Sequence, residues 1–203
     1  MITIYGNPRS TCTRRVLMTL AENEVPYEMH VVDFAKGEHK QPEHVKRQPF
    51  GRIPALEDDG FEMFESRAMA RYVDQKGGGR LTPSDPKARA RMEQWISVET
   101  SEFSGHVMRF VYEHVFGRKQ DPAVLEASGK ALETTLGVME QRLAQSPYLA
   151  GAELTLADVV FMPEYGYALG TPLKDVFAKY PAVTAWWNRV SERPTWRKVT
   201  GQG

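Results

Sequence analysis

The sequence has 203 residues, of which 41% are hydrophobic, and its 26 basic and 26 acidic side chains leave no net charge. This composition is typical of a globular protein with a buried core and excludes intrinsic disorder. The balanced charge gives no indication of a nucleic-acid or membrane partner.

The remaining composition excludes several classes of site. Cys12 is the single cysteine, which excludes an internal disulfide framework, and the five histidines lack the spacing of a metal site. The first residues do not have the basic and apolar segments of a signal peptide, and no apolar run approaches the ~18 residues of a membrane span. We therefore expect a soluble, cytoplasmic protein without a metal.

The first 76 residues predict a small domain that mixes strands with helices. A crossover helix should make the first two strands parallel, and the turn at Asp58-Asp59-Gly60 should make the last two an antiparallel hairpin. In chain order, the expected elements are a strand at 2–5, a helix at 11–24, a strand at 27–33, a loop with one short helix at 34–50, strands at 55–57 and 61–64, and a helix at 65–75.

The glycine- and proline-rich segment 77–86 predicts a linker, and residues 87–203 predict an all-helical second domain. Helical periodicity over 86–117 and 121–145 indicates an antiparallel helical pair. Shorter helices are expected to begin near Leu156, Ala182 and Thr195. The expected fold class is an α/β domain followed by an all-α domain.

Polar residues between the first strand and the first helix form the first candidate site. Backbone N–H groups and the helix dipole converge where the helix begins, so an anion is stabilised there, and the hydroxyl of Ser10 can donate to a thiolate. The alternative is that Ser10 or Thr11 only caps the helix.

Three further segments each carry a weak signal. A cis bond between Ile53 and Pro54 would turn the backbone so that Ile53 presents its N–H and C=O to an extended peptide. Glu65 and Ser66, at a helix start, can bind the ammonium and carboxylate of an amino acid, or they can serve as a cap. His39 and Lys40 can pair with a second carboxylate, or they can belong to an ordinary solvated loop.

Taken together, these segments resemble the cytosolic glutathione S-transferases, and the phi class most of all. The resemblance rests on Ser10-Thr11-x-x-Arg14-Arg15, on Gly37-Glu38-His39-Lys40, on residues 48–55 and on Phe64-Glu65-Ser66-Arg67. It extends to the second domain through residues 148–158, where Thr155 and Asp158 have the spacing of a capping box, so we interpret Asp158 as structural.

The resemblance implies a thioredoxin-like domain that binds glutathione as co-substrate, with no bound cofactor. It implies that Ser10 bonds the glutathione sulfur and that Ile53, beside a cis Pro54, bonds the cysteinyl backbone. The other implied contacts are Glu65 and Ser66 with the γ-glutamyl end, His39 and Lys40 with the glycine carboxylate, and Arg52, where phi members usually carry Gln, near the γ-glutamyl region.

Thiol activation is the physical reason for such an arrangement. A free thiol has a pKa near ~8.5, and lowering it by ~2 units requires about 2.7 kcal/mol of preferential thiolate stabilisation. One hydroxyl hydrogen bond and the helix dipole together supply roughly that amount. Cys12 is the alternative catalytic group, because some related proteins use a cysteine for thiol exchange, at the position that Ser10 occupies here.

The resemblance also implies an apolar site for the second substrate between the domains. The candidate lining residues are Arg9 and Phe34 in the first domain and Phe103, His106, Val107, Phe110 and Tyr165 in the second. The helical spacing of the residues in the second domain fits a core as well as a binding surface. Phe50 is expected to insert into a partner subunit, which predicts a homodimer. The expected function is glutathione conjugation to small hydrophobic electrophiles; Cys12-dependent thiol exchange or peroxide reduction and a non-catalytic ligand-binding module are the alternatives.

Overall fold

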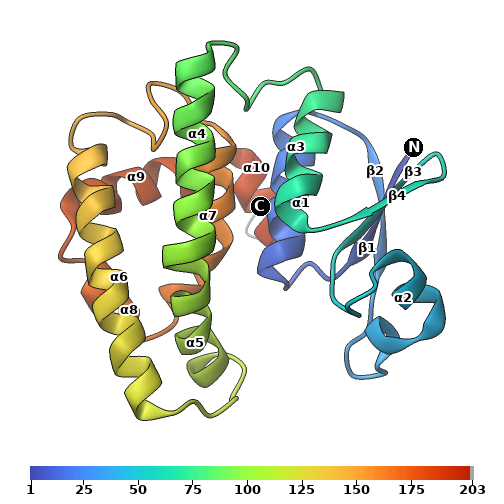
Figure 1. The fold of residues 1–203 in the computed structure, drawn as a ribbon, viewed down its shortest axis with the longest axis horizontal. Helices are drawn as coiled ribbons and strands as arrows, with labels where there is room; N and C mark the ends of the chain where they lie inside the picture. Colours follow the sequence, from blue (N-terminus) through green and yellow to red (C-terminus); the bar gives the residue numbers. More distant parts are fainter. Residues whose placement is uncertain (202–203) are drawn as a thin grey trace. The chain divides into compact units, whose positions relative to one another are not determined.

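The computed structural model describes residues 1–201 and contains two compact units (Figure 1). The first unit comprises Met1–Thr82 and the stretch that begins at Pro194, and the second comprises Pro83–Arg193. The predicted fold class is confirmed, since a unit with a four-stranded sheet is followed by a helical unit.

The sheet of the first unit has the strand order β2-β1-β3-β4. β1 and β2 are parallel and the other two pairs are antiparallel, as predicted. The strands are β1 (Ile2–Gly6), β2 (Tyr27–Val31), β3 (Ala55–Asp58) and β4 (Phe61–Phe64). The helices are α1 (Thr11–Glu22), α2 (Pro42–Arg47) and α3 (Ser66–Lys76), with a 3₁₀ turn η1 (Glu38–Lys40) before α2.

The core of this unit lies between the sheet and the helices α1 and α3, which cover one side of the sheet while α2 lies on the other (Figure 1). Side chains alternate along β1, so Ile2 and Ile4 enter this core, whereas the ring of Tyr5 lies 4.4 Å from the Arg47 guanidinium of α2. The other buried members of the core are Val16, Leu17, Leu20, Leu56, Met69 and Val73. Each such side chain contributes about 1.5–3 kcal/mol to the free energy of unfolding.

The strand register brings four connections to one end of the sheet. Gly6 is paired with Val31, and Tyr5, one residue earlier, is paired with Ala55, which is itself paired with Phe64. The loops after β1, after β2, before β3 and after β4 therefore all emerge together, and they contain most of the predicted site residues.

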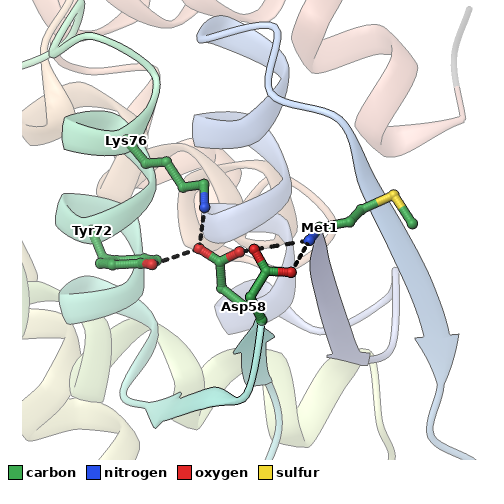
Figure 2. A network of polar contacts seen from close by, with 5 residues as sticks. Met1, Asp58, Tyr72 and Lys76 are labelled. Atoms are coloured by element: carbon green, nitrogen blue, oxygen red, sulfur yellow. Dashed lines mark hydrogen bonds and ion pairs between the residues drawn. The ribbon is translucent and has the colours of Figure 1, made fainter.

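The opposite end of the sheet is closed by a polar network around Asp58 (Figure 2). The buried carboxylate of Asp58 accepts a hydrogen bond of 2.6 Å from the Tyr72 hydroxyl and a short one from the Lys76 ammonium. These two hydrogen bonds lower the pKa of Asp58 below its ordinary value. The network fastens the end of β3 to the last two turns of α3.

The second unit consists of helices, among which α7 is the most buried. Its elements are α4 (Pro86–Val98), a π-helical turn η2 (Glu99–Phe103), α5 (Ser104–His114), α6 (Pro122–Leu143), α7 (Leu156–Ala168), α8 (Leu173–Phe177) and α9 (Pro181–Ser191). Within residues 1–201, no helix is both long and apolar enough to cross a membrane.

The helical unit differs from the prediction in two places. The expected helix at 86–117 is interrupted by the π-helical turn, which an uninterrupted apolar period does not indicate. The short helix α8 was not predicted. The capping box is confirmed, since the buried carboxylate of Asp158 accepts hydrogen bonds from the Thr155 N–H, the Leu149 N–H and the Trp186 indole.

The last helix, α10 (Pro194–Thr200), corrects the expected domain boundary, which placed all of 87–203 in the helical domain. α10 packs against α1 in the first unit, with Trp196 buried and Val199 against the core of that unit. The Thr195 hydroxyl also donates a short hydrogen bond to the Glu22 carboxylate at the end of α1. The prediction failed because the apolar pattern of a short helix does not say which core it joins.

Candidate active site

Ser10 lies at the first position of the site, directly before α1. It is the N-cap of α1, where its Oγ accepts a hydrogen bond of 3.3 Å from the Thr13 N–H. Its own N–H is bonded to the Asn7 carbonyl at 2.8 Å, which closes the loop after β1. Among the residues that the structure describes, the Ser10 hydroxyl donates to no acceptor. A hydroxyl has one proton to donate as well as two lone pairs, so Ser10 can cap α1 and donate to a ligand at once.

The segment before β3 lies close to the loop after β1. The Ile53–Pro54 bond is cis, as predicted. A Cβ at Gly6 would lie 2.7 Å from the Thr13 Oγ1 and 3.3 Å from the Pro54 Cβ, so only glycine permits this approach. β1, the start of α1 and the Ile53–Pro54 segment are therefore in direct contact.

Glu65 adopts an uncommon backbone conformation directly before α3. Its φ is +72° and its ψ is 101°, a combination that residues other than glycine rarely adopt. Such strain costs about 1–3 kcal/mol and is found mostly at functional sites. The Glu65 side chain is exposed and makes no capping bond to α3. Its carboxylate is thus placed at the N-terminus of a helix and remains available to a ligand.

Ser66 follows Glu65 and is connected to α1. The buried guanidinium of Arg15 donates a hydrogen bond of 2.8 Å from Nη1 to the Ser66 Oγ. The same nitrogen lies 3.8 Å from the sulfur of Cys12, which is half-buried on the first turn of α1. Arg15 thereby joins the helix start that contains Ser10 to the one that contains Ser66.

His39 and Lys40 lie in η1 and contact neighbouring segments. The His39 ring stacks on Phe34 with a centroid distance of 4.2 Å, and the Lys40 ammonium donates to the Phe50 carbonyl at 3.2 Å. The His39 Nδ1 is buried with no hydrogen-bond partner among the described residues. Burial, and then the charges of Lys40 and His44, lower the pKa of His39. A carboxylate bound there would supply the missing partner.

The exposed residues beside these segments are Arg9, Arg52 and Phe50. The backbone N–H of Arg9 donates a hydrogen bond of 3.0 Å to the Asn7 Oδ1. The Arg52 guanidinium lies 5.7 Å from the centroid of the Phe50 ring, and Phe50, 60% exposed, also contacts the edge of Phe64. Within the described chain, no group of three or more His, Cys, Asp or Glu side chains is arranged to hold a metal ion.

The candidate electrophile residues of the helical unit do not share one environment. Phe103, Val107 and Tyr165 are fully buried, so their assignment as lining residues is wrong. Phe103 packs against Phe161, and Tyr165 lies between Phe177 and Trp187, where burial raises the pKa of its phenol. Their helical spacing fits a core as well as a binding surface, and here it forms a core.

His106 and Phe110 remain partly exposed on α5, and the His106 Nδ1 lies 3.2 Å from the Ser128 hydroxyl. The sequence interpretation missed Phe116, which follows the end of α5. Phe116 is exposed, and its ring lies 6.3 Å from Tyr112 and 6.0 Å from Tyr167. The only signal for it in the sequence is a phenylalanine directly before Gly117.

Two family models match this chain. The model of the glutathione S-transferase N-terminal domain matches residues 1–75, and that of the C-terminal domain matches residues 102–194. The chain belongs to the glutathione S-transferase family. Its thioredoxin-like domain is the part that contains Ser10, Ile53, Glu65 and Ser66.

Relatives of this transferase match over nearly its whole length. The probable glutathione S-transferase GSTF1 of Oryza sativa subsp. japonica is 38% identical over 98% of this chain and 94% of its own. The solved structure of glutathione transferase F2 from Populus trichocarpa is 36% identical, covers 100% of both chains and has a TM-score of 0.94. Glutathione S-transferase I from maize, solved with an atrazine glutathione conjugate, is 33% identical over 98% of this chain and 96% of its own, with a TM-score of 0.90.

Proposed function

We propose that this glutathione S-transferase conjugates glutathione to small hydrophobic electrophiles and that the hydroxyl of Ser10 stabilises the reacting thiolate. The observation that supports Ser10 is its uncommitted hydroxyl proton at the N-terminus of α1. The Ile53 segment and the Glu65–Ser66 helix start lie at the same end of the sheet. Extended glutathione would run across these loops, its sulfur toward Ser10 and its γ-glutamyl end toward Glu65 and Ser66.

The reaction requires a thiolate that attacks the electrophilic carbon while the leaving group departs with its electron pair. The hydroxyl of Ser10 would donate to the sulfur, and the dipole of α1 would favour its negative charge. A hydrogen bond to a charged acceptor is worth about 1.5–3 kcal/mol, which lowers the thiol pKa by about 1–2 units. Ser10 needs no other base, since solvent takes the thiol proton once the pKa lies near neutrality.

The test compares Ser10→Ala with the wild type in glutathione conjugation to chlorodinitrobenzene. Loss of the hydrogen bond should lower kcat/KM about 10- to 100-fold and raise the pKa of the bound thiol, read from thiolate absorbance. Ser10→Ala also removes a helix cap, so Asp121→Ala is the control: Asp121 caps α6 through the Ala123 N–H at 2.8 Å. Asp121→Ala should lose similar stability and keep full activity. Normal thiol activation in Ser10→Ala would refute the role of Ser10.

Cys12→Ala separates the alternative function from this one. The contact of the Cys12 sulfur with the Arg15 guanidinium is the single observation in favour of a catalytic cysteine. If Cys12→Ala abolished activity and Ser10→Ala did not, the protein would be a thiol-exchange enzyme. We expect Cys12→Ala to conjugate chlorodinitrobenzene at the wild-type rate.

The apolar surfaces that would receive the electrophile are proposed from exposure. Phe34 is exposed in the first unit, and Phe110 and Phe116 are accessible in the helical unit. The atrazine conjugate held by the maize relative supports an aromatic, halide-bearing substrate class. Phe116→Ala should raise the KM for the aryl halide and leave the KM for glutathione unchanged, whereas Phe103→Ala should only destabilise the protein.

We also propose that the enzyme is a cytoplasmic homodimer that uses glutathione as its co-substrate without a bound cofactor. Phe50 is suited to insertion into a second subunit, because its ring is exposed and lies against Phe64. Light scattering should give the mass of a dimer for the wild type and of a monomer for Phe50→Asp. A monomeric wild type would refute this part of the proposal.

A further inference from the structure

A buried histidine of α2, His44, bonds the backbone next to the proposed glutathione-binding residue Ile53. The side chain of His44 is 6% exposed, and its Nε2 lies 2.6 Å from the carbonyl oxygen of Arg52. A carbonyl oxygen can only accept, so the contact assigns a proton to Nε2. His44 therefore donates to this carbonyl from a ring that the surrounding residues hold in place.

The bond to the Arg52 carbonyl also determines the direction of the Ile53 N–H. The two groups belong to one planar peptide unit, and the Arg52–Ile53 bond is trans, so its C=O and N–H point in opposite directions. When His44 fixes the carbonyl, the N–H is fixed with it. A hydrogen bond to the carbonyl further polarises the peptide and strengthens its N–H as a donor.

The preceding residues of this loop are held by side chains as well. The buried Gln48 accepts the Phe50 N–H at 2.8 Å through Oε1, and Lys40 donates to the Phe50 carbonyl at 3.2 Å. These two contacts fix the peptides on either side of Phe50. The His44 contact acts two residues further along, at the peptide whose N–H would meet glutathione.

We propose that His44 is a positioning residue for glutathione: it holds the Arg52–Ile53 peptide so that the Ile53 N–H is aimed at the cysteinyl backbone of glutathione. This inference rests on the proposed function, because it assumes that glutathione binds along the Ile53 segment. His44 touches no substrate and acts through the peptide alone.

Kinetics of His44→Leu and His44→Gln in the full-length enzyme test the proposal. Leu removes the donor, whereas the amide of Gln can replace the Nε2–H. His44→Leu should raise the KM for glutathione about five- to tenfold, the worth of one hydrogen bond, with kcat and the KM for chlorodinitrobenzene changed less than twofold. His44→Gln should recover most of the affinity. Tyr72→Phe is the control, since it removes a 2.6 Å hydrogen bond of the same unit at the other end of the sheet.

Two results would overturn the proposal: an unchanged KM for glutathione in His44→Leu, or equal losses in His44→Leu and Tyr72→Phe. If His44→Leu does not fold, an experiment on the wild type still tests the proposed contact between the Ile53 N–H and glutathione. Titration with S-methylglutathione should shift the ¹⁵N–¹H resonance of Ile53 strongly, and an unmoved resonance would overturn the proposal. A wild type that conjugates no glutathione would instead refute the proposed function, so the two failures are distinguishable.

Discussion

The buried guanidinium of Arg15 donates a 2.8 Å hydrogen bond to the hydroxyl of Ser66, a residue 51 positions further along the chain. Because Arg15 lies in the first two turns of α1 and Ser66 begins α3, this bond fixes the two helix starts of the candidate site relative to each other. Hydrogen bonds to a charged group contribute about 1.5–3 kcal/mol to stability, so the pair should be strongly coupled.

A double-mutant cycle measures this coupling. Arg15→Met, Ser66→Ala and the double variant should give a coupling free energy of about 1.5–3 kcal/mol in urea unfolding. Both single variants should also weaken glutathione binding, because Ser66→Ala removes the hydroxyl and Arg15→Met removes the group that holds it in place. Strictly additive effects of the two substitutions would show that the contact contributes nothing to stability.

The strained backbone of Glu65 predicts that replacing this residue by glycine stabilises the protein but weakens glutathione binding. Glu65→Gly should raise the free energy of unfolding by roughly 0.5–2 kcal/mol, because glycine adopts a positive φ without the strain cost but adds unfolded-state entropy. It should also raise the KM for glutathione about 10- to 100-fold through the lost carboxylate.

Glu24→Gly is the matched control for Glu65→Gly. Glu24 has a φ of +55° and lies beyond the end of α1, where its exposed carboxylate pairs with Arg80 at 3.1 Å. Glu24→Gly should gain similar stability and keep the wild-type KM for glutathione. Equal glutathione affinity in Glu65→Gly and Glu24→Gly would contradict a binding role for Glu65.

The lowered pKa of His39 predicts that glutathione binds more tightly in acid. A carboxylate next to His39 favours the protonated ring, so the pKa of His39 rises on binding. Affinity must therefore increase as pH falls through the interval between the pKa of His39 in the complex and its lowered pKa in the free enzyme. An exposed ion pair of this kind is worth about two- to fivefold in Kd.

Calorimetry with S-methylglutathione measures this effect without interference from thiol ionisation. The increase in affinity should be present in the wild type and absent from His39→Gln. His30→Gln, at an exposed position of β2, should behave as the wild type does. The same pH dependence in His39→Gln would assign it to another group.

The network around Asp58 predicts an acid-sensitive contribution to stability. The pKa of Asp58 is lowered in the folded state by Lys76 and Tyr72, so its contribution is complete above the unfolded-state pKa of about 4 and is lost as pH falls through the folded-state value. Asp58→Asn should therefore be less stable than the wild type at neutral pH, and the difference should shrink as the pH falls below the unfolded-state pKa of about 4.

Urea unfolding at a series of pH values checks this, with Asp59→Asn as the exposed neighbouring control. At high pH the network should lose stability as the pH rises, because the hydrogen bonds with Asp58 raise the pKa values of Tyr72 and Lys76. Their contribution is present below about pH 10 and is lost as they deprotonate. A constant difference between Asp58→Asn and the wild type from acid to neutral pH would refute this account.

The sequence predicted the first unit well because its signals are local. Alternation along 2–5, the periodicity of the first helix and the Asp58-Asp59-Gly60 turn each define an element within one to three residues of its observed bounds. Such signals say nothing about contacts between distant residues. The bond of Arg15 to Ser66 and that of His44 to the Arg52 carbonyl were therefore not predicted.

Each error in the helical unit has its own physical cause. Phe103, Val107 and Tyr165 have the spacing of one helix face, but spacing does not tell whether that face meets a ligand or another helix. The π-helical turn at Glu99–Phe103 changes which residues share a face, and nothing in the apolar period marks it. Phe116 lies within the predicted helix 86–117 but beyond the observed end of α5 at His114, and the helical period does not indicate that its ring is exposed.

The position of α10 in the first unit has a consequence for synthesis on the ribosome. Val199 and Trp196 complete a structure whose other members have been translated more than one hundred residues earlier. Since domains generally fold as units during translation, we expect the amino-terminal unit to complete its packing only after α10 has left the exit tunnel. A nascent chain arrested after residue 190 should therefore be cleaved by protease within the first unit, and release of a chain that includes α10 should protect it.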